Sequence, residues 1–186
     1  RTPIEAIIKA AELGQKVSPY LSDTKPKKWA AVHYSEIARN KRGSDYVAAY
    51  GEVLWPTVGA FEAFSREGLP VGVVNDYQLE KGLLDGYKVL FLPNKEELSP
   101  AQKQAVDKFV AAGGVVIEND SSWNWLDISG NRIAVQELTD IIIKNMDTAP
   151  VKGNSPVSKV HTVAYEDTKN NRDVICISND FGFAQS

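Results

Sequence analysis

The sequence predicts a three-layer α/β domain, in which helices cover both faces of a mostly parallel sheet. Short apolar runs alternate along the chain with segments of helical periodicity. Four of these runs occupy residues 29–34, 71–74, 87–92 and 115–117. Runs without polar alternation are typical of parallel strands that are buried on both faces. We therefore place the α/β domain at residues 28–147.

The chain opens with a predicted helix that ends near Gly14. Thr2 is a suitable N-cap, Pro3 occupies the first helical position, and a carboxylate follows three residues after Thr2. Apolar residues then recur at helical spacing, so one face of this helix should dock against another surface. Residues 15–28 contain two prolines and are expected to form a loop. Residues 1–27 are interpreted as a docking helix with a linker.

A polar loop and a long helix connect the first two predicted strands. Residues 35–45 are polar and are predicted as the loop. Apolar residues recur at helical spacing over residues 46–66, and Gly68 closes this helix. Pro56 lies inside the pattern, so we expect it to break or kink the helix near Trp55.

The helix after the third strand has the clearest start and stop signals of the chain. Ser99 is its N-cap and Gln102 is the reciprocal capping-box residue, with a proline at the first helical position. Gly113 and Gly114 end the helix directly before the fourth strand. Because a nucleotide-binding glycine loop follows a strand, this glycine pair is interpreted as a helix end.

The remainder of the chain differs in character from this body. A helix is predicted over residues 133–145, followed by a segment with two prolines. Two strand-like runs, at residues 160–165 and 174–178, end the chain with a polar turn between them. We interpret residues 148–186 as a linker and a β-hairpin, which either extends the sheet edge or starts a further β domain.

Composition and charge argue against several classes of protein. The 186 residues carry a net charge of −3, whereas nucleic-acid-binding proteins usually show a basic excess. One cysteine and two distant histidines, His33 and His161, disfavour a disulfide framework or a zinc site. No apolar run approaches the about 18 residues of a membrane span. We therefore expect no nucleic-acid or membrane partner, no metal and no cofactor.

A binding site, if present, is expected at the carboxyl ends of the strands, where open parallel sheets bind their ligands. Polar residues gather at these ends, although loops and helix caps use the same residue types for their own hydrogen bonds. We assign no catalytic residue. The candidate binding residues are His33, Glu36, Asn75, Asn94, Glu118, Asp120, Trp123 and Trp125.

Several of these residues leave alternative roles open. His33 is a structural histidine or, if a carboxylate such as Glu36 orients it, a general base. Two strand-end carboxylates, such as Glu36 and Glu118, would support a small hydrolase if they met in one pocket about 5–10 Å apart. The carboxylates available for such a pair are Glu36, Asp76, Glu96, Glu118 and Asp120. Trp123 and Trp125 lie in a polar loop, where they stack on sugar rings, fill a subunit interface or fold back as a satellite core.

The order of these motifs resembles one known family. The resemblance is carried by the sequence FEAFSREGLPVGVV at residues 61–74, YKVLFLPN at 87–94 and AAGGVVI at 111–117. Over residues 28–125 the chain is similar to the β-galactosidase trimerisation domain of family-42-type glycoside hydrolases. The resemblance implies a flavodoxin-like fold of the class I glutamine-amidotransferase type.

The resemblance also implies an accessory role in a larger enzyme. In that family a separate barrel carries the two catalytic carboxylates and precedes the domain, which helps to build the oligomer. The chain starts with Arg1 rather than Met, and we expect it to be a non-catalytic oligomerisation domain excised from such a glycoside hydrolase. Its expected partners are the preceding barrel, a following β domain and further copies, with carbohydrate as a candidate ligand.

One departure from the related amidotransferases bears on activity. Those enzymes place a nucleophilic Cys directly after the strand that matches residues 115–117, whereas this chain continues with Glu118, Asn119 and Asp120. Glutamine hydrolysis is therefore not expected. A small carboxylate-dependent hydrolase and a carbohydrate-binding module remain the alternatives. The compartment is left open, with an exported protein favoured over a cytoplasmic one.

Overall fold

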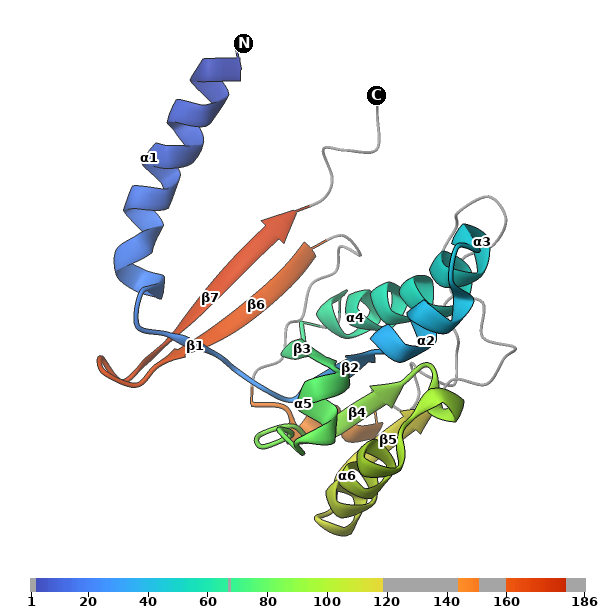
Figure 1. Cartoon of the computed structure of the whole chain (residues 1–186). Coiled ribbons are helices and arrows are strands. Elements are labelled where there is room, and N and C mark those ends of the chain that lie inside the picture. Colours follow the sequence, from blue (N-terminus) through green and yellow to red (C-terminus); the bar gives the residue numbers. More distant parts are fainter. Residues whose placement is uncertain (1–2, 67, 119–143, 151–159, 180–186) are drawn as a thin grey trace.

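A computed structural model of the chain describes residues 3–66, 68–118, 144–150 and 160–179 (Figure 1). These residues form a mixed α/β structure with a parallel sheet of four strands and an antiparallel sheet of three. The order of the parallel sheet is β3-β2-β4-β5. Its strands are β2 (Ala30–Tyr34), β3 (Val71–Asn75), β4 (Val89–Leu92) and β5 (Val115–Glu118). The four predicted parallel strands are confirmed.

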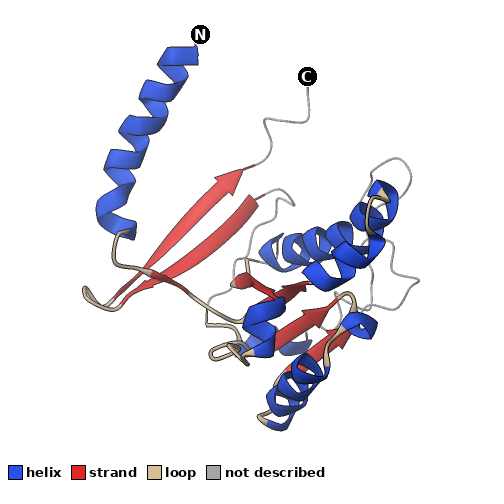
Figure 2. Cartoon of the chain, viewed as in Figure 1, coloured by secondary structure: helices blue, strands red, loops and turns tan. Residues whose placement is uncertain are grey.

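Helices cover both faces of the parallel sheet, as the apolar runs predict (Figure 2). The helix α4 (Trp55–Arg66) lies on one face. The shorter α5 (Asp76–Glu80) and α6 (Pro100–Ala111) lie on the other. The central strand β2 is consequently enclosed, and its first four side chains are buried.

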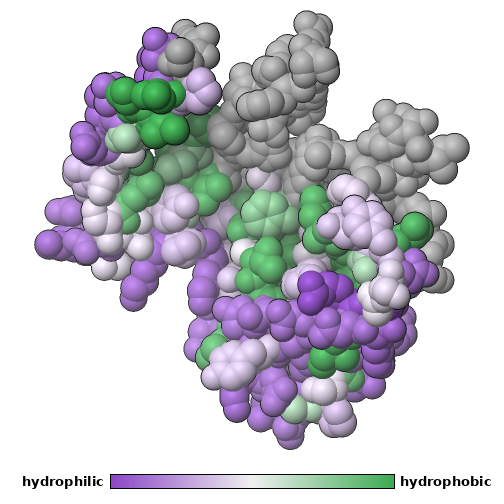
Figure 3. All heavy atoms as spheres, turned by 45° about the horizontal axis from the view of Figure 1, so that its top comes forward, coloured by the Kyte–Doolittle hydropathy of each residue, from purple (hydrophilic) through white to green (hydrophobic). Residues whose placement is uncertain are grey.

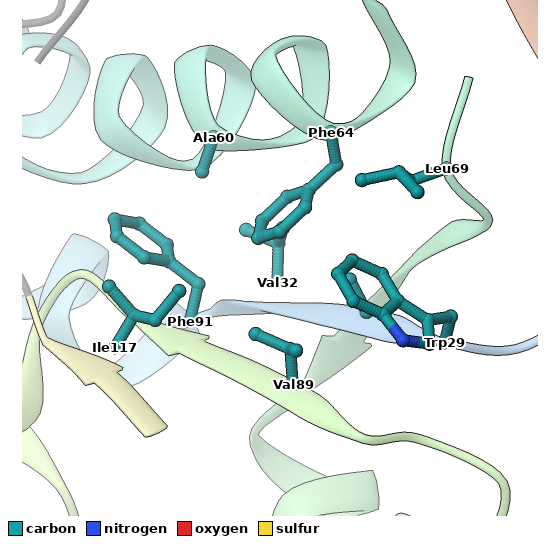
Figure 4. Close-up of a cluster of buried hydrophobic side chains, with 9 residues drawn as sticks. Trp29, Val32, Ala60, Phe64, Leu69, Val89, Phe91 and Ile117 are labelled. Atoms are coloured by element: carbon teal, nitrogen blue, oxygen red, sulfur yellow. The ribbon is translucent and has the colours of Figure 1, made fainter. Parts of the chain in front are cut away.

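The larger hydrophobic cluster lies between α4 and the sheet (Figure 4). Phe64 points from α4 towards the sheet, where its ring meets the edge of the Trp29 ring at a centroid distance of 6.0 Å. The Trp29 indole donates to the hydroxyl of Thr148 at 2.8 Å, which ties the turn η3 (Met146–Thr148) to this cluster. The strands contribute Val32, Val89, Phe91 and Ile117.

The second cluster fills the opposite face. Leu79 of α5 and Phe109 of α6 pack on alternate side chains of the same strands, because successive residues of a strand point to opposite faces. Gly114 has no room for a side chain, since a Cβ there would lie 2.3 Å from the Phe109 ring. The predicted capping box of Ser99 and Gln102 is confirmed at the start of α6.

Two helical segments differ from their predictions. The helix α1 (Pro3–Leu21) runs on through Gly14 and Pro19, although a glycine inside a helix costs about 1 kcal/mol and a proline about 3 kcal/mol relative to alanine. The predicted loop at residues 15–28 is therefore wrong over its first part.

The predicted polar loop at residues 35–45 is also wrong over most of its length. It contains the helix α2 (Glu36–Arg42), whose N-cap is Ser35 and whose end is marked by Gly43 at φ 57°. The Ser35 hydroxyl accepts the backbone N–H of Ala38 at 3.0 Å. Basic residues in the last turn of α2 further stabilise it, because they face the negative end of the helix dipole.

Pro56 does not break the helical segment that contains it. The segment runs from α3 (Tyr46–Ala48) through a π-helical turn, η1 (Ala49–Leu54), directly into α4. Proline lacks a backbone N–H and clashes with the carbonyl four residues before it, which an ordinary α-helix cannot accommodate without distortion. The wider π turn just before Pro56 absorbs this conflict.

The strands near the C-terminus form a hairpin, as the sequence predicts, but they do not extend the parallel sheet. The strand β6 (Val160–Asp167) pairs antiparallel with β7 (Arg172–Asn179) and, on its other side, with the short β1 (Lys25–Pro26). Figure 1 shows this hairpin beside α1. The predicted helix at residues 133–145 lies almost entirely outside the described residues. No helix within the described ranges has the length and apolar character needed to cross a bilayer.

Removing the Phe91 side chain should destabilise the parallel body strongly. Phe91 is fully buried between β4 and α4, so Phe91→Ala is expected to lower the free energy of unfolding by about 3–5 kcal/mol. Chemical denaturation measures the change. The control is Val110→Ala, on the exposed side of α6, which should change the stability by less than about 0.5 kcal/mol. Equal effects of the two substitutions would contradict the described core.

Candidate functional site

The strand order places a switch point between β2 and β4. The chain proceeds from β2 to β3 on one side and then crosses to β4 on the other. Open parallel sheets bind ligands in the crevice at the carboxyl ends of the strands where the direction of winding reverses. His33 lies near the end of β2, and Asn94 follows the end of β4 by two residues. Both side chains are buried.

His33 is held by a carboxylate from the neighbouring crossover. Its Nε2 lies 3.0 Å from Oδ1 of Asp76, the first residue of α5. Asn75, the last residue of β3, caps α5 by accepting the backbone N–H of Gln78 at 2.9 Å. The end of β3 and this cap therefore fix the position of Asp76.

Two further groups donate three hydrogen bonds to Asp76. Its Oδ2 accepts the backbone N–H of Ile37 at 2.8 Å. Gln102, which is fully buried, donates its amide to Oδ1 at 2.9 Å and to the backbone carbonyl of Asp76 at 3.2 Å. The carboxylate thus joins β2, α2, α5 and α6. Because Oδ1 and Oδ2 accept from amide donors, Asp76 also acts as the acceptor towards His33.

This network fixes the tautomer of His33. The Nε2 atom carries the hydrogen that it donates to Asp76, which leaves Nδ1 with a free lone pair. Nδ1 is buried and has no hydrogen-bond partner. Burial lowers the pKa of His33, and the neighbouring Asp76 carboxylate offsets part of that decrease. His33 is therefore a neutral imidazole near pH 7.

Asn94 presents a second unpaired polar atom near the end of the adjacent strand. Its amide Nδ2 is buried and has no hydrogen-bond partner. A carboxylate-oriented imidazole has the arrangement of a general base. A base must however reach the proton that it removes, and Nδ1 of His33 is closed to solvent. The described residues thus hold His33 and Asp76 as an internal polar link rather than as an open reactive pair.

Charged residues surround the strand ends and pair with one another. Glu97 lies in the 3-10 turn η2 (Lys95–Glu97) and forms ion pairs with Lys41 and Arg42, both from α2. Its Oε1 lies 3.1 Å from a terminal guanidinium nitrogen of Arg42. The hydrogen bond from Lys41 is the main cause that lowers the pKa of Glu97. Glu118, at the end of β5, pairs with Lys95. In these pairs a basic side chain neutralises each of the two carboxylates.

The structure separates the candidate residues that the sequence grouped together. Glu36 is exposed in the first turn of α2, and Asp76, not Glu36, is the carboxylate that orients His33. Glu118 binds a lysine instead of a second carboxylate, and β4 lies between its strand and β2. Three candidates, Asp120, Trp123 and Trp125, lie outside the described residues.

Two residues that complete the network are not among the binding residues predicted from the sequence, although Asp76 is one of the strand-end carboxylates considered for a hydrolase. Gln102 is predicted only as part of the capping box. Its side chain in fact accepts from the backbone N–H of Ser99 in the cap and also donates to the carboxylate of Asp76. Asp76 follows a predicted strand end and carries a usable signal: a carboxylate directly after an N-capping Asn. Its partner His33 is 43 residues away, so local pattern alone does not pair them.

A cavity of about 520 Å³ lies at the opposite end of the sheet, near the starts of β4 and β5. Its lining includes Tyr87, Lys88, Lys108 and Gly113, and none of the predicted site residues. Lys88 already donates to the Gly113 carbonyl there. Within the described part of the chain, no group of three His, Cys, Asp or Glu side chains could hold a metal ion.

Comparison with protein-family models, with curated proteins and with solved structures finds no match for this chain. The geometry described above is therefore the basis for assigning a function.

Replacing the Asp76 carboxylate should destabilise the protein. Asp76→Asn retains the shape of the side chain but leaves too few acceptors for His33, Ile37 and Gln102, so the free energy of unfolding should fall by about 2–4 kcal/mol. Denaturant titration measures this fall. Asp107→Asn, at an exposed position of α6, is the matched control and should have little effect. A neutral outcome for Asp76→Asn would refute the central role of this carboxylate.

The burial of His33 predicts a pH-dependent stability. Because the pKa of His33 is lowered in the folded state, only the unfolded chain takes up a proton as the pH falls below about 6.5. The His33 contribution to stability is thus complete above that pH and is lost on acidification. The stability difference between wild type and His33→Gln should shrink from about pH 7.5 to about pH 5.5. Thermal unfolding across this range provides the measurement, and a difference that grows on acidification would contradict it.

Proposed function

We propose that this chain is a non-catalytic assembly domain of a β-galactosidase-like glycoside hydrolase. The observation that carries the proposal is the helix α1, which has 19 residues and no buried side chain. A soluble helix normally gains most of its stability by packing an apolar face, and helices of this length are marginal alone. The exposed apolar side chains of α1 are Ile4, Ile7, Ile8, Leu13 and Tyr20.

The charged residues of α1 are confined to a narrow stripe. Glu5, Lys9, Glu12 and Lys16 recur at spacings of three and four residues, which places them on one side of the helix. The remaining circumference is mostly apolar, and hydrophobic side chains lie on the surface where α1 projects from the molecule (Figure 3). A second protein surface that covered this face would stabilise the helix.

The antiparallel sheet supports the same proposal. Two residues of β7, Ile175 and Ile177, are 51% and 71% exposed and lie on one face of the hairpin. Val163 of β6 is exposed on the other face. The third strand of this sheet, β1, has only two residues, and a hairpin with so little added pairing is marginally stable in isolation. The hairpin and α1 together are consistent with a surface that packs on another copy of the chain.

The site geometry is consistent with a domain that performs no catalysis. The buried Nδ1 of His33 is closed to substrate, and the carboxylates Glu97 and Glu118 are neutralised by basic partners. The strand order β3-β2-β4-β5 corresponds to the core of a flavodoxin-like sheet, as expected for the amidotransferase-like fold of the resembled family. The proposal that the parent enzyme is a glycoside hydrolase rests on the sequence motifs at residues 61–74, 87–94 and 111–117, which resemble those of the β-galactosidase trimerisation domain.

Sedimentation velocity of the whole chain over a range of concentrations tests the assembly role. We expect a discrete homo-oligomer, and the double variant Ile4→Glu/Ile8→Glu should weaken association at least about tenfold, because each isoleucine buried contributes about 1.5–3 kcal/mol. The control, Glu5→Gln/Glu12→Gln, alters the polar stripe of the same helix and should associate normally.

Two results would overturn the proposal. A wild-type chain that stays monomeric at every concentration would remove the assembly role. Turnover of aryl galactosides by the purified chain would remove the non-catalytic role. Near-ultraviolet circular dichroism checks that the charged variant keeps its fold, as expected because no α1 side chain is buried.

A further inference from the structure

Three aromatic side chains form an exposed cluster far from α1. Tyr46 of α3, Tyr50 of η1 and Trp55 of α4 are 67%, 37% and 42% exposed. In Figure 1, α3 and α1 lie at opposite sides of the molecule. We call Tyr46, Tyr50 and Trp55 the aromatic platform. It shares no residue with the surfaces assigned to assembly, so it is an independent feature.

The three rings are in contact with one another. The centroids of Tyr46 and Tyr50 are 4.1 Å apart with an angle of 31° between the rings. Tyr50 and Trp55 meet edge to face at 6.4 Å and 61°. The rings are therefore packed side by side, which holds them in place before any ligand arrives and reduces the entropy lost on binding.

The π turn is what brings Trp55 to the platform. Tyr46 and Tyr50 are four residues apart, the spacing that stacks side chains on an α-helix. Tyr50 and Trp55 are five residues apart, which an α-helix would separate by about 140° around its axis. In η1 the backbone N–H of Trp55 instead bonds to the carbonyl of Tyr50, so residues five apart fall on the same side. Pi turns of this kind occur frequently at functional sites.

The shape and size of the platform favour a small ligand. Tyr46 and Tyr50 leave no gap between their rings, so a ligand lies across them rather than inside an aromatic cage. At their observed exposures the three rings offer roughly 300 Å² of contact, whereas a stable protein partner covers about 800 Å² per side. A second copy of the chain is therefore too large an occupant for this surface alone.

The charge of the segment indicates a neutral ligand. Residues 46–58 contain one charged residue, Glu52, and its carboxylate is paired with Arg42 at 3.0 Å. This segment contains no lysine or arginine, and the neighbouring Lys41 and Arg42 of α2 are already paired with Glu52 and Glu97, so few free cations remain for the phosphates of a single-stranded nucleic acid. The matching ligand is neutral, with a flat apolar face for the rings and hydroxyl groups at its edge.

We propose that the aromatic platform binds neutral oligosaccharides. The C–H groups on one face of a pyranose carry partial positive charge and are attracted to the negative face of an aromatic ring. The tyrosine hydroxyls can donate to and accept from the sugar hydroxyls at the margin of the stack. The platform rests on described residues alone and does not require the assembly role to be correct.

Calorimetric titration of the whole chain with neutral tetrasaccharides tests the proposal. The panel contains β-linked galactose, glucose, xylose and mannose oligomers, and we expect at least one to bind. Tyr46→Ala and Trp55→Ala should each weaken that binding by about 3–10-fold, the loss of one aromatic contact. Both side chains are partly exposed, so these variants are expected to fold.

Two further variants locate the bound sugar on the platform. Tyr77→Ala removes a tyrosine of similar exposure, 64%, from α5 and should leave binding unchanged. Pro56→Ala retains all three rings but removes the residue that favours the π turn, so it should also weaken binding.

The proposal fails on any of three outcomes. No binding across the panel would exclude the oligosaccharide. Binding that Tyr46→Ala and Trp55→Ala leave intact would place the sugar elsewhere on the chain. Binding of a proline-rich peptide in place of every oligosaccharide would assign the platform to a protein partner. Association measured by sedimentation is read independently, so a failure here leaves the assembly proposal unchanged.

Discussion

The enclosure of β2 on both faces is the constraint on which the rest of the body depends. This strand lies between β3 and β4, with α4 covering one face and α5 and α6 the other. A strand without a solvent-exposed face accepts a polar side chain only where that side chain finds a partner in the interior. His33 is the buried polar residue of β2 that needs such a partner, and the carboxylate of Asp76 hydrogen-bonds to it.

The polar network that results connects four elements through one carboxylate. Asp76 accepts from β2, α2 and α6 while it begins α5, so the relative positions of these elements are specified more narrowly than by apolar packing alone. Gln102 serves the cap of α6 and the network at once. Two buried atoms near the strand ends remain unpaired, Nδ1 of His33 and Nδ2 of Asn94. They mark the switch point as the part of the described body where hydrogen bonding is incomplete.

The interior and the periphery of the molecule differ in what they offer to other molecules. In the described body, the buried side chains of His33 and Asn94 lie near the strand ends, and the exposed ion pair between Lys95 and Glu118 lies at the end of β5. The periphery instead exposes apolar side chains on α1, on the hairpin and on the aromatic platform. These exposed apolar side chains are the observations on which both proposals rest.

Local patterns in the sequence determined the strands, the capping of α6 and the α/β class, because each depends on residues a few positions apart. The same patterns carried the signals for α2, between Ser35 and Gly43, but the polar composition of that segment obscured them. The tertiary structure decided the strand order and the pairing of His33 with Asp76, since both depend on how crossovers place distant residues. The effect of Pro56 also depends on the tertiary structure. The helix α4 that contains it packs on the sheet, and the segment just before Pro56 forms a wider π-helical turn instead of a break.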